Sequence, residues 1–232
     1  NTLTYNTVLN SVHSLNILLG QSYNTDRLDN SSLSSVGGYT SSVVKTLSAA
    51  ANVSGSSIST KNVLVSYFSR VEYAYKERYL LSASLREDGS SRFGLNTKYG
   101  VFPSASVGWR IIDEGFMKKL PSVSDLKLRL SYGVNGNNSI PDYGSIPQIG
   151  SDGYVLGSTQ ALAIGQAPSN LANPDIKWER SEAIDAGVDF GFFANRLTGS
   201  FDYYNKLNTA LLLNVPVPAT SGFTSYLSNA GS

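Results

Sequence analysis

The sequence predicts an all-β protein, an antiparallel up-and-down transmembrane β-barrel of which this 232-residue chain would build a part. Three observations predict this class: apolar and polar residues alternate along eight segments, the links between these segments alternate between short and long, and charge is low beside many aromatic residues. Charged residues make up 15% of the chain, which also contains 14 Tyr and 9 Phe. No apolar run approaches the length of a membrane helix, so strands would have to cross a membrane.

The clearest alternation runs from Asp125 to Asn135, where every second residue is apolar and the residues between are ionic or small. This period of two is typical of a strand with one apolar face. The same pattern predicts seven further strands, around residues 3–9, 15–19, 63–75, 79–85, 99–111, 184–192 and 197–203. A short turn from Glu114 to Leu120 is the one segment with a helical period.

The links between the predicted strands differ in length in a regular way. Tight turns are expected at Ser11–His13, Lys76-Glu77 and Ala194-Asn195, with a link of about a dozen residues, Asp113–Ser124, on the same side. Long polar loops are expected at Asn24–Lys61, Asp88–Lys98, Gly136–Lys177 and after Leu207. Outer-membrane barrels place short turns in the periplasm and long loops outside. We therefore expect the three tight turns and Asp113–Ser124 to face the periplasm, and the four long segments to face the outside of the cell.

A soluble β-sandwich would show the same alternation of links. Three features favour lipid: the apolar face carries almost no charge in mid-strand, Tyr and Trp gather toward strand ends, and the opposite face is small or ionic instead of forming a second core. Arg180 and Glu182 break the pattern, since they share the parity of Ile184 and Val188. Both lie at the loop end of their strand, where it could project beyond the bilayer.

The composition argues against several functional classes. A net charge of +1 does not favour nucleic acid as a partner, and the absence of Cys excludes disulfides, thiolate nucleophiles and Cys-ligated zinc. The single His13 cannot build a multi-histidine metal site, and we expect a solvated turn histidine rather than a member of a hydrolytic triad. No pair of acidic residues has an interpretable spacing. We therefore predict a protein that is not an enzyme and binds no cofactor.

Several blocks of sequence, taken in order, resemble one family. They are Arg86–Gly94, Val101–Arg110, Leu126–Gly133, Asn173–Glu179, Asp189–Leu197, Asp202–Tyr204, Leu211–Pro218 and Thr220–Phe223. Together they closely resemble the SusC/RagA-type TonB-dependent outer-membrane transporters of Bacteroidetes. The first 85 residues resemble this family only in their pattern of strands and loops.

The resemblance implies a 22-stranded barrel closed by a plug, of which residues 1–232 would form a middle-to-late barrel portion of about eight to nine strands without the plug. It also implies a multi-pass β-barrel in the bacterial outer membrane that imports bulky nutrients, oligosaccharides or peptides. A SusD-like surface lipoprotein and TonB, acting through the plug, would be its partners, with outer-membrane lipid around it. Two alternatives stay open: a small complete outer-membrane barrel, and a soluble or surface-attached β-rich module that binds glycans as an adhesin.

Candidate contact residues lie in the long segment from Gly136 to Lys177. Asp142, Tyr143, Asp152 and Tyr154 would suit a sugar or the lipoprotein, because aromatic rings stack on C–H surfaces while carboxylates bind hydroxyls; packing against neighbouring loops is the alternative for each. We expect Lys127, Arg129, Asp185 and Asp189 to face the lumen.

Two local structures are also expected near the loop ends of the strands. We expect Trp178, at a junction between loop and strand, to anchor the chain at the membrane interface. We expect the segment from Asp88 to Gly94 to form a compact outward turn. In this turn Gly89 and Gly94 would have positive φ, and the side chains of Asp88 and Ser90 would bind backbone amides.

Overall fold

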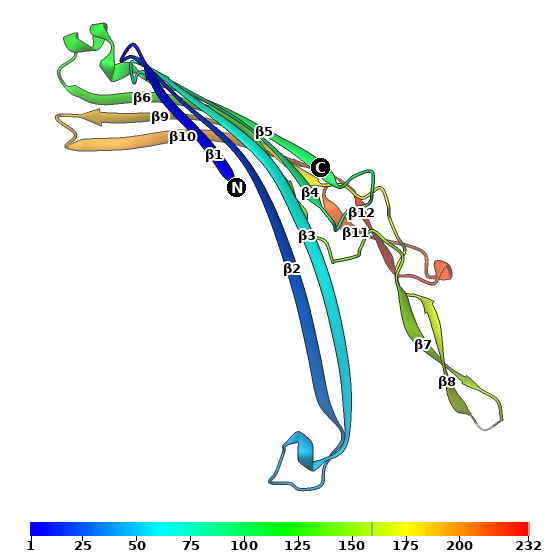
Figure 1. The fold of residues 1–232 in the computed structure, drawn as a ribbon. Coiled ribbons are helices and arrows are strands. Elements are labelled where there is room, and N and C mark those ends of the chain that lie inside the picture. The colour runs from blue at the N-terminus through cyan, green and yellow to red at the C-terminus, as the bar shows by residue number, and fades with distance from the viewer. Residues whose placement is uncertain (159, 232) are drawn as a thin grey trace.

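The computed structural model describes residues 1–158 and 160–231. Eight strands form one open antiparallel sheet in the order β1-β2-β3-β4-β5-β6-β9-β10 (Figure 1). The strands are β1 (Thr2–Leu9), β2 (His13–Tyr39), β3 (Ala50–Tyr75), β4 (Tyr79–Ser90), β5 (Tyr99–Arg110), β6 (Val123–Asn137), β9 (Glu179–Phe192) and β10 (Leu197–Thr209). All eight predicted strands are confirmed. Each of these strands pairs with the next one along the chain, including β6 with β9, although a separate hairpin lies between these two in the sequence.

The tight turns lie within one residue of the positions that the sequence predicts. The turn between β1 and β2 contains Asn10 and Ser11 at φ of 50° and 59°, and that between β3 and β4 contains Lys76 and Glu77 at 51° and 55°. Two consecutive residues with positive φ are typical of hairpin turns whose twist matches the strands. The longer link on the same side contains two short 3₁₀ helices, η2 (Ile111–Asp113) and η3 (Gly115–Lys119), which agrees with the expected helical turn.

The long segment from Asn24 to Lys61 is not a loop, as the sequence suggested. Strands β2 and β3 continue through it, paired from Asn24 opposite Leu64 to Val36 opposite Asn52, and only residues 40–49 connect them, including η1 (Leu47–Ala49). This ribbon is rich in serine on both faces, so it lacks the apolar alternation of a half-buried strand. Backbone hydrogen bonds hold the two strands together beyond the sheet (Figure 1).

Two small hairpins account for most of the remaining long segments. Strands β7 (Ile149–Leu156) and β8 (Ala161–Pro168) pair within the expected Gly136–Lys177 loop and project away from the main sheet (Figure 1). Strands β11 (Leu212–Pro216) and β12 (Ser225–Asn229) pair near the end of the chain, on either side of η4 (Ala219–Ser221). The segments that we expected to be loops therefore fold in part into two additional β-hairpins.

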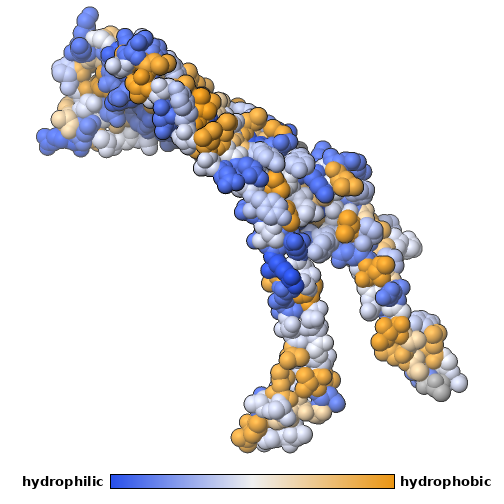
Figure 2. All heavy atoms as spheres, viewed as in Figure 1, coloured by the Kyte–Doolittle hydropathy of each residue, from blue (hydrophilic) through white to orange (hydrophobic). Residues whose placement is uncertain are grey.

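Few side chains are buried in this sheet. Within the described residues, one hydrophobic cluster is buried and lies at the long-loop end, while large apolar residues are exposed along the strands and on the β7–β8 hairpin (Figure 2). A soluble sheet would bury such residues, since an exposed apolar surface of this extent marks a contact with lipid or protein. Among the described residues, none of the helices is both long and apolar enough to cross a membrane.

Candidate functional site

The strand register sorts side chains into two faces, which we call the apolar face and the polar face. One row across the apolar face contains Leu15, Tyr73, Leu81, Val107, Leu130, Ala186 and Tyr203. The neighbouring row on the polar face contains Asn16, Glu72, Ser82, Ser106, Ser131, Asp185 and Tyr204. Because successive residues of a strand point to opposite faces, the alternation in the sequence becomes a sheet with one apolar surface and one polar surface.

A group of ion pairs lies on the polar face between β6, β9 and β10. Arg129 donates to both oxygens of Asp189 at 2.9 Å and to Asp202 at 2.8 Å. Lys127 lies opposite Asp189 in the register, and Asp185 lies opposite Ser131. Lys127, Arg129, Asp185 and Asp189 thus lie on the polar face, whereas Asp202 was missed. Its alternation with Phe201 and Tyr203 on β10 is the signal that would have identified it.

A row of aromatic rings crosses the apolar face at the short-turn end. His13, Tyr75, Tyr79 and Trp109 lie opposite one another on four successive strands, with ring centroids 4.9 to 6.3 Å apart. Nδ1 of His13 is 2.7 Å from the hydroxyl of Tyr73. The expectation of a solvated turn histidine is therefore wrong: His13 is the first residue of β2, half-buried against the Tyr75 ring. Such a row is typical of the aromatic girdle at a membrane interface.

Glu114 connects this aromatic row to the 3₁₀ link between β5 and β6. Its carboxylate accepts hydrogen bonds from the Tyr79 hydroxyl at 2.7 Å and from the Trp109 indole at 3.2 Å, and Arg78 lies 3.6 Å away. The hydrogen bond from Tyr79 is the main reason that the pKa of Glu114 is lowered. The link is therefore fixed against the end of the sheet by an ionised side chain.

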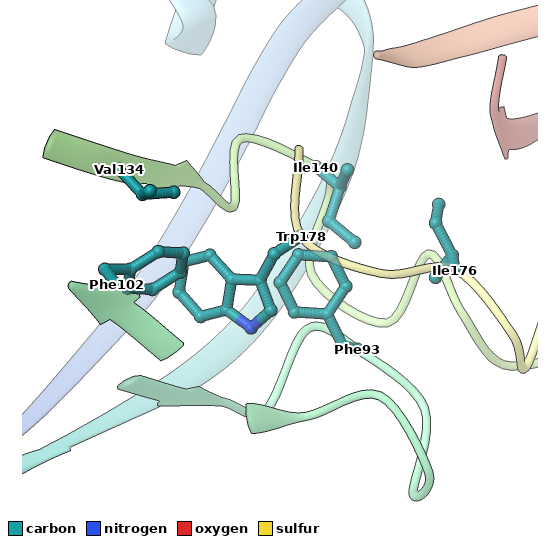
Figure 3. Close-up of a cluster of buried hydrophobic side chains, with 6 residues drawn as sticks. All are labelled: Phe93, Phe102, Val134, Ile140, Ile176 and Trp178. Atoms are coloured by element: carbon teal, nitrogen blue, oxygen red, sulfur yellow. The ribbon is translucent and has the colours of Figure 1, made fainter. Parts of the chain in front are cut away.

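The hydrophobic cluster at the long-loop end joins segments that are far apart in the sequence. Phe93, Phe102, Val134, Ile140, Ile176 and Trp178 pack together (Figure 3). The Trp178 ring lies 5.1 Å from that of Phe93 and 5.3 Å from that of Phe102, and its indole N–H donates to the Lys98 carbonyl at 2.9 Å. The expectation that Trp178 anchors the chain at the membrane interface is wrong, because the side chain is buried in this cluster and its polar atom is satisfied inside the protein.

The glycines of the Asp88–Gly94 segment have another role than expected. Neither Gly89 nor Gly94 has a positive φ. A Cβ on Gly94 would meet the carbonyl oxygen of Pro174, so this glycine allows two backbones to approach closely. Ser90 does accept a hydrogen bond from the Arg92 amide, at 3.3 Å, whereas Asp88 binds the Arg86 guanidinium at 2.8 Å instead of a backbone amide.

Two of the four candidate contact residues are held in contacts within the chain. Arg92 donates to Asp142 at 2.7 Å, and the side chains of this pair are 27% and 13% exposed. Burial alone would raise the pKa of Asp142, but hydrogen bonds from Arg92 and Asn62 outweigh it and lower the pKa. The hydroxyl of Tyr143 accepts a hydrogen bond from the Lys61 amide at 3.1 Å. Asp142 and Tyr143 therefore bind the segment after β6 to strand β3 and to the link between β4 and β5.

The other two candidates lie on the projecting hairpin. Asp152 and Tyr154 are both exposed on β7, and Tyr154 retains 72% of its accessible surface. The structure does not bring the four candidates into one site. Asp152 and Tyr154 are free to contact a partner, while Asp142 and Tyr143 contribute to the local fold.

A cavity of about 310 Å³ beside the Asp142–Tyr143 segment was not predicted. It is lined by Pro141, Gln148, Asn170, Asn214, Phe223 and Tyr226, among others, and lies between this segment and the β11–β12 hairpin. Asn170 accepts from the Gln148 amide at 2.7 Å and donates to the Ile146 carbonyl at 3.0 Å, which fixes one wall. Amides and aromatic rings together suit a neutral polar ligand. No motif predicted the cavity, because its lining comes from separate segments of the chain.

The comparisons with known proteins agree with this architecture. The family described as TonB dependent receptor-like, beta-barrel, matches residues 1–232, so the chain belongs to this family. TonB-dependent receptor P3 of Formosa agariphila is 36% identical over 100% of the chain and 23% of its own length. TonB-dependent receptor SusC of Bacteroides thetaiotaomicron is 38% identical over 75% of the chain and 18% of its own length. The chain thus spans about a fifth of the relatives that it matches.

Solved structures give the same result for the fold. The structure of the RagAB peptide transporter matches 99% of the chain and 25% of its own chain, with a TM-score of 0.85 and 28% identity. The RagAB peptide importer in its open-open state also matches 99% of the chain, with a TM-score of 0.80 and 29% identity. The open sheet is therefore part of a TonB-dependent barrel, and the predicted SusC/RagA resemblance is confirmed.

Proposed function

We propose that residues 1–232 form one wall of the barrel of an outer-membrane importer for bulky nutrients. The observation that carries this proposal is the division of an eight-stranded sheet into an apolar face and a polar face, with an aromatic row at the short-turn end. The apolar face would contact lipid and the polar face, with Lys127, Arg129, Asp185 and Asp189, would line the lumen. A plug, TonB and the force that drives import would act through other parts of the full protein.

The substrate in this proposal is an oligosaccharide or a peptide. Both have amide or hydroxyl groups that amide side chains can bind, and both offer surfaces on which aromatic rings can pack. The cavity beside Gln148 and Asn170 supports this choice, as does the similarity to the solved structure of a peptide transporter. No covalent chemistry is part of the proposed function.

The proposed partner at the cell surface is a lipoprotein of SusD type. The exposed residues Asp152 and Tyr154 on the β7–β8 hairpin are the proposed contacts. Replacing both by Ala in the full-length protein should lower the amount of lipoprotein that co-purifies, while the barrel remains in the outer membrane. Unchanged co-purification would show that the hairpin is not the contact.

Accessibility in intact cells tests the orientation. A cysteine at Ser151, on the β7–β8 hairpin, should react with a reagent that cannot cross the membrane, whereas a cysteine at Asn195, in the β9–β10 turn, should react only after the outer membrane is opened. Reaction at Asn195 but not at Ser151 would reverse the orientation. Reaction at both in a protein that dissolves without detergent would instead support a soluble or surface-attached module.

Uptake tests the transport activity itself. A strain without the full-length gene should lose TonB-dependent uptake of one labelled oligosaccharide or peptide and regain it with the intact gene. A purified protein that converted such a compound chemically would contradict the proposal that the protein is a transporter without catalytic activity.

A further inference from the structure

The apolar face is not uniform but contains a groove across β5, β6, β9 and β10. It has a volume of about 570 Å³, within the range of small-molecule sites. Its lining includes Trp109, Leu128, Ala186, Val188, Phe201 and Tyr203. The groove forms because Ala186 presents only a methyl group between Leu130 and Tyr203, its partners in the register.

The groove lies on the apolar face of the sheet and extends to β10, the last strand of the sheet in this chain. Arg129 and Gly187 also line it, and both belong to the polar face by strand parity. The guanidinium of Arg129 is bound to Asp189 on that face, so at Arg129 and Gly187 the groove reaches the main chain. The other lining side chains are apolar or aromatic.

The end of the groove near the short turns adjoins a cationic segment. Trp109 in the groove wall is hydrogen-bonded to Glu114, and η3 follows directly with Lys118 and Lys119. Residues 76–78 and 110–122 contain five basic and three acidic residues. Two of the acids are already paired, Glu114 with Arg78 and Asp113 with Arg110.

Within the described residues, no carboxylate lies within ion-pair distance of Lys118 or Lys119. Phe116 and Leu120, on the same segment, are 55% and 52% exposed. Lysines beside exposed apolar side chains are typical of a segment at the membrane–water interface, where the ammonium groups reach the headgroups.

We propose that this groove binds an acyl chain of an anionic glycerophospholipid from the leaflet on the short-turn side, with Lys118 and Lys119 contacting its headgroup phosphate. An apolar groove on the outer face alone would accept any acyl chain. The neighbouring excess of positive charge selects an anionic headgroup, because each basic residue near the surface attracts such lipids. This inference rests on the proposed placement of the chain in a membrane.

A photoreactive residue in the groove tests the proposal in the full-length protein. Benzoylphenylalanine replaces Tyr203 in the groove wall or, as a control, Tyr5 on the same face of β1. The protein is reconstituted in vesicles of one part phosphatidylglycerol to nine parts phosphatidylethanolamine and irradiated, and its lipid adducts are identified by mass. At position 203 we expect phosphatidylglycerol about fivefold or more above its share of the vesicle, and at position 5 an adduct ratio equal to that share.

Variants separate the headgroup contact from the groove. Lys118→Gln with Lys119→Gln should return the adduct ratio at position 203 to the share in the vesicle. Ala186→Leu should lower the total of lipid adducts at position 203, whereas Ala83→Leu, on the same face outside the groove, should not.

Three other results would overturn the proposal. An adduct ratio at position 203 equal to the vesicle share would indicate ordinary surrounding lipid. Protein–protein adducts there would show that a second copy of the barrel covers the groove. A protein that alkaline carbonate extracts from the vesicles, with no lipid adducts at either position, would contradict the membrane placement itself.

Discussion

Replacing Asp142 by Asn should release the segment after β6 from the sheet without unfolding the sheet itself. The Asp142 carboxylate is 2.7 Å from Nε of Arg92, and Asn62 donates to it at 3.5 Å. Asn keeps the size of the side chain and an oxygen acceptor but removes the charge. The change therefore isolates the electrostatic part of the contact and leaves the packing of the neighbouring cluster in place.

The expected magnitude follows from the partial burial of this pair. A hydrogen bond to a charged group contributes about 1.5 to 3 kcal/mol, whereas an exposed ion pair contributes about 0 to 1 kcal/mol. The Asp142 side chain is 13% exposed and that of Arg92 is 27% exposed, so the pair lies between these limits. We expect a loss of about 1 to 2 kcal/mol, which corresponds to about a 5- to 30-fold increase in local opening.

Hydrogen exchange in the full-length protein measures this opening. Amides between residues 139 and 146 should exchange faster in Asp142→Asn, while those in β4 and β5 should not change. Asp152→Asn is the matched control, because the Asp152 side chain has no ion pair within the described residues. In a double-mutant cycle with Arg92→Gln, the two effects should be less than additive.

Acidification should have the same effect as the Asp142 substitution. The pKa of Asp142 is lowered in the folded protein, so its contribution is complete above its ordinary value of 3.8 and is lost as the pH falls below that value. Protection in this segment, taken as the exchange rate of an unstructured amide relative to the observed rate at the same pH, should therefore fall in the wild type below about pH 4 and less so in Asp142→Asn. Unchanged exchange in the variant, or additive effects in the cycle, would refute the role assigned to this pair.

Two further substitutions test the faces of the sheet and the close contact at the loop end. Leu85→Arg on the apolar face, six residues from Tyr79 of the aromatic row, should destabilise the barrel in lipid by about 2 to 4 kcal/mol, whereas Ser84→Arg on the polar face should cost far less; equal losses in reversible unfolding would contradict the assignment of faces. Gly94→Ala should lower stability by about 1 to 3 kcal/mol because its Cβ meets the Pro174 carbonyl, while Gly115→Ala, with open space around it, should not; equal melting temperatures would exclude the close contact.

The strands could be predicted from the sequence because one face of each is apolar. The alternation from Asp125 to Asn135 reflects a strand with one apolar face and one polar face, and β6 covers this segment. The outer halves of β2 and β3 carry no such signal. Polar residues predominate on both of their faces. These halves are strands because two distant segments of the chain pair with each other, from Asn24 opposite Leu64 to Val36 opposite Asn52.

The candidate site was less predictable, since it depends on contacts between distant segments. Aromatic and acidic residues in a long polar segment identified Asp142 and Tyr143, but no pattern indicates that Arg92 and Lys61 would bind them. The sequence also could not show that Trp178 is buried, because its neighbours Phe93 and Phe102 come from other segments. Burial is a property of the assembled loop end and not of the local sequence.

The blocks that carry the family resemblance have a structural role at the long-loop end. The block from Arg86 to Gly94 and that from Asn173 to Glu179 meet there, with Gly94 against Pro174 and Phe93 against Trp178. They hold the bases of the loops in a fixed arrangement. The cavity next to them is lined in part by residues outside these blocks, including Gln148, Asn170 and Tyr226. Function is commonly carried by loops that a rigid scaffold positions, so we expect the substrate preference of the proposed importer to depend on the cavity residues and not on the blocks at the base of the loops.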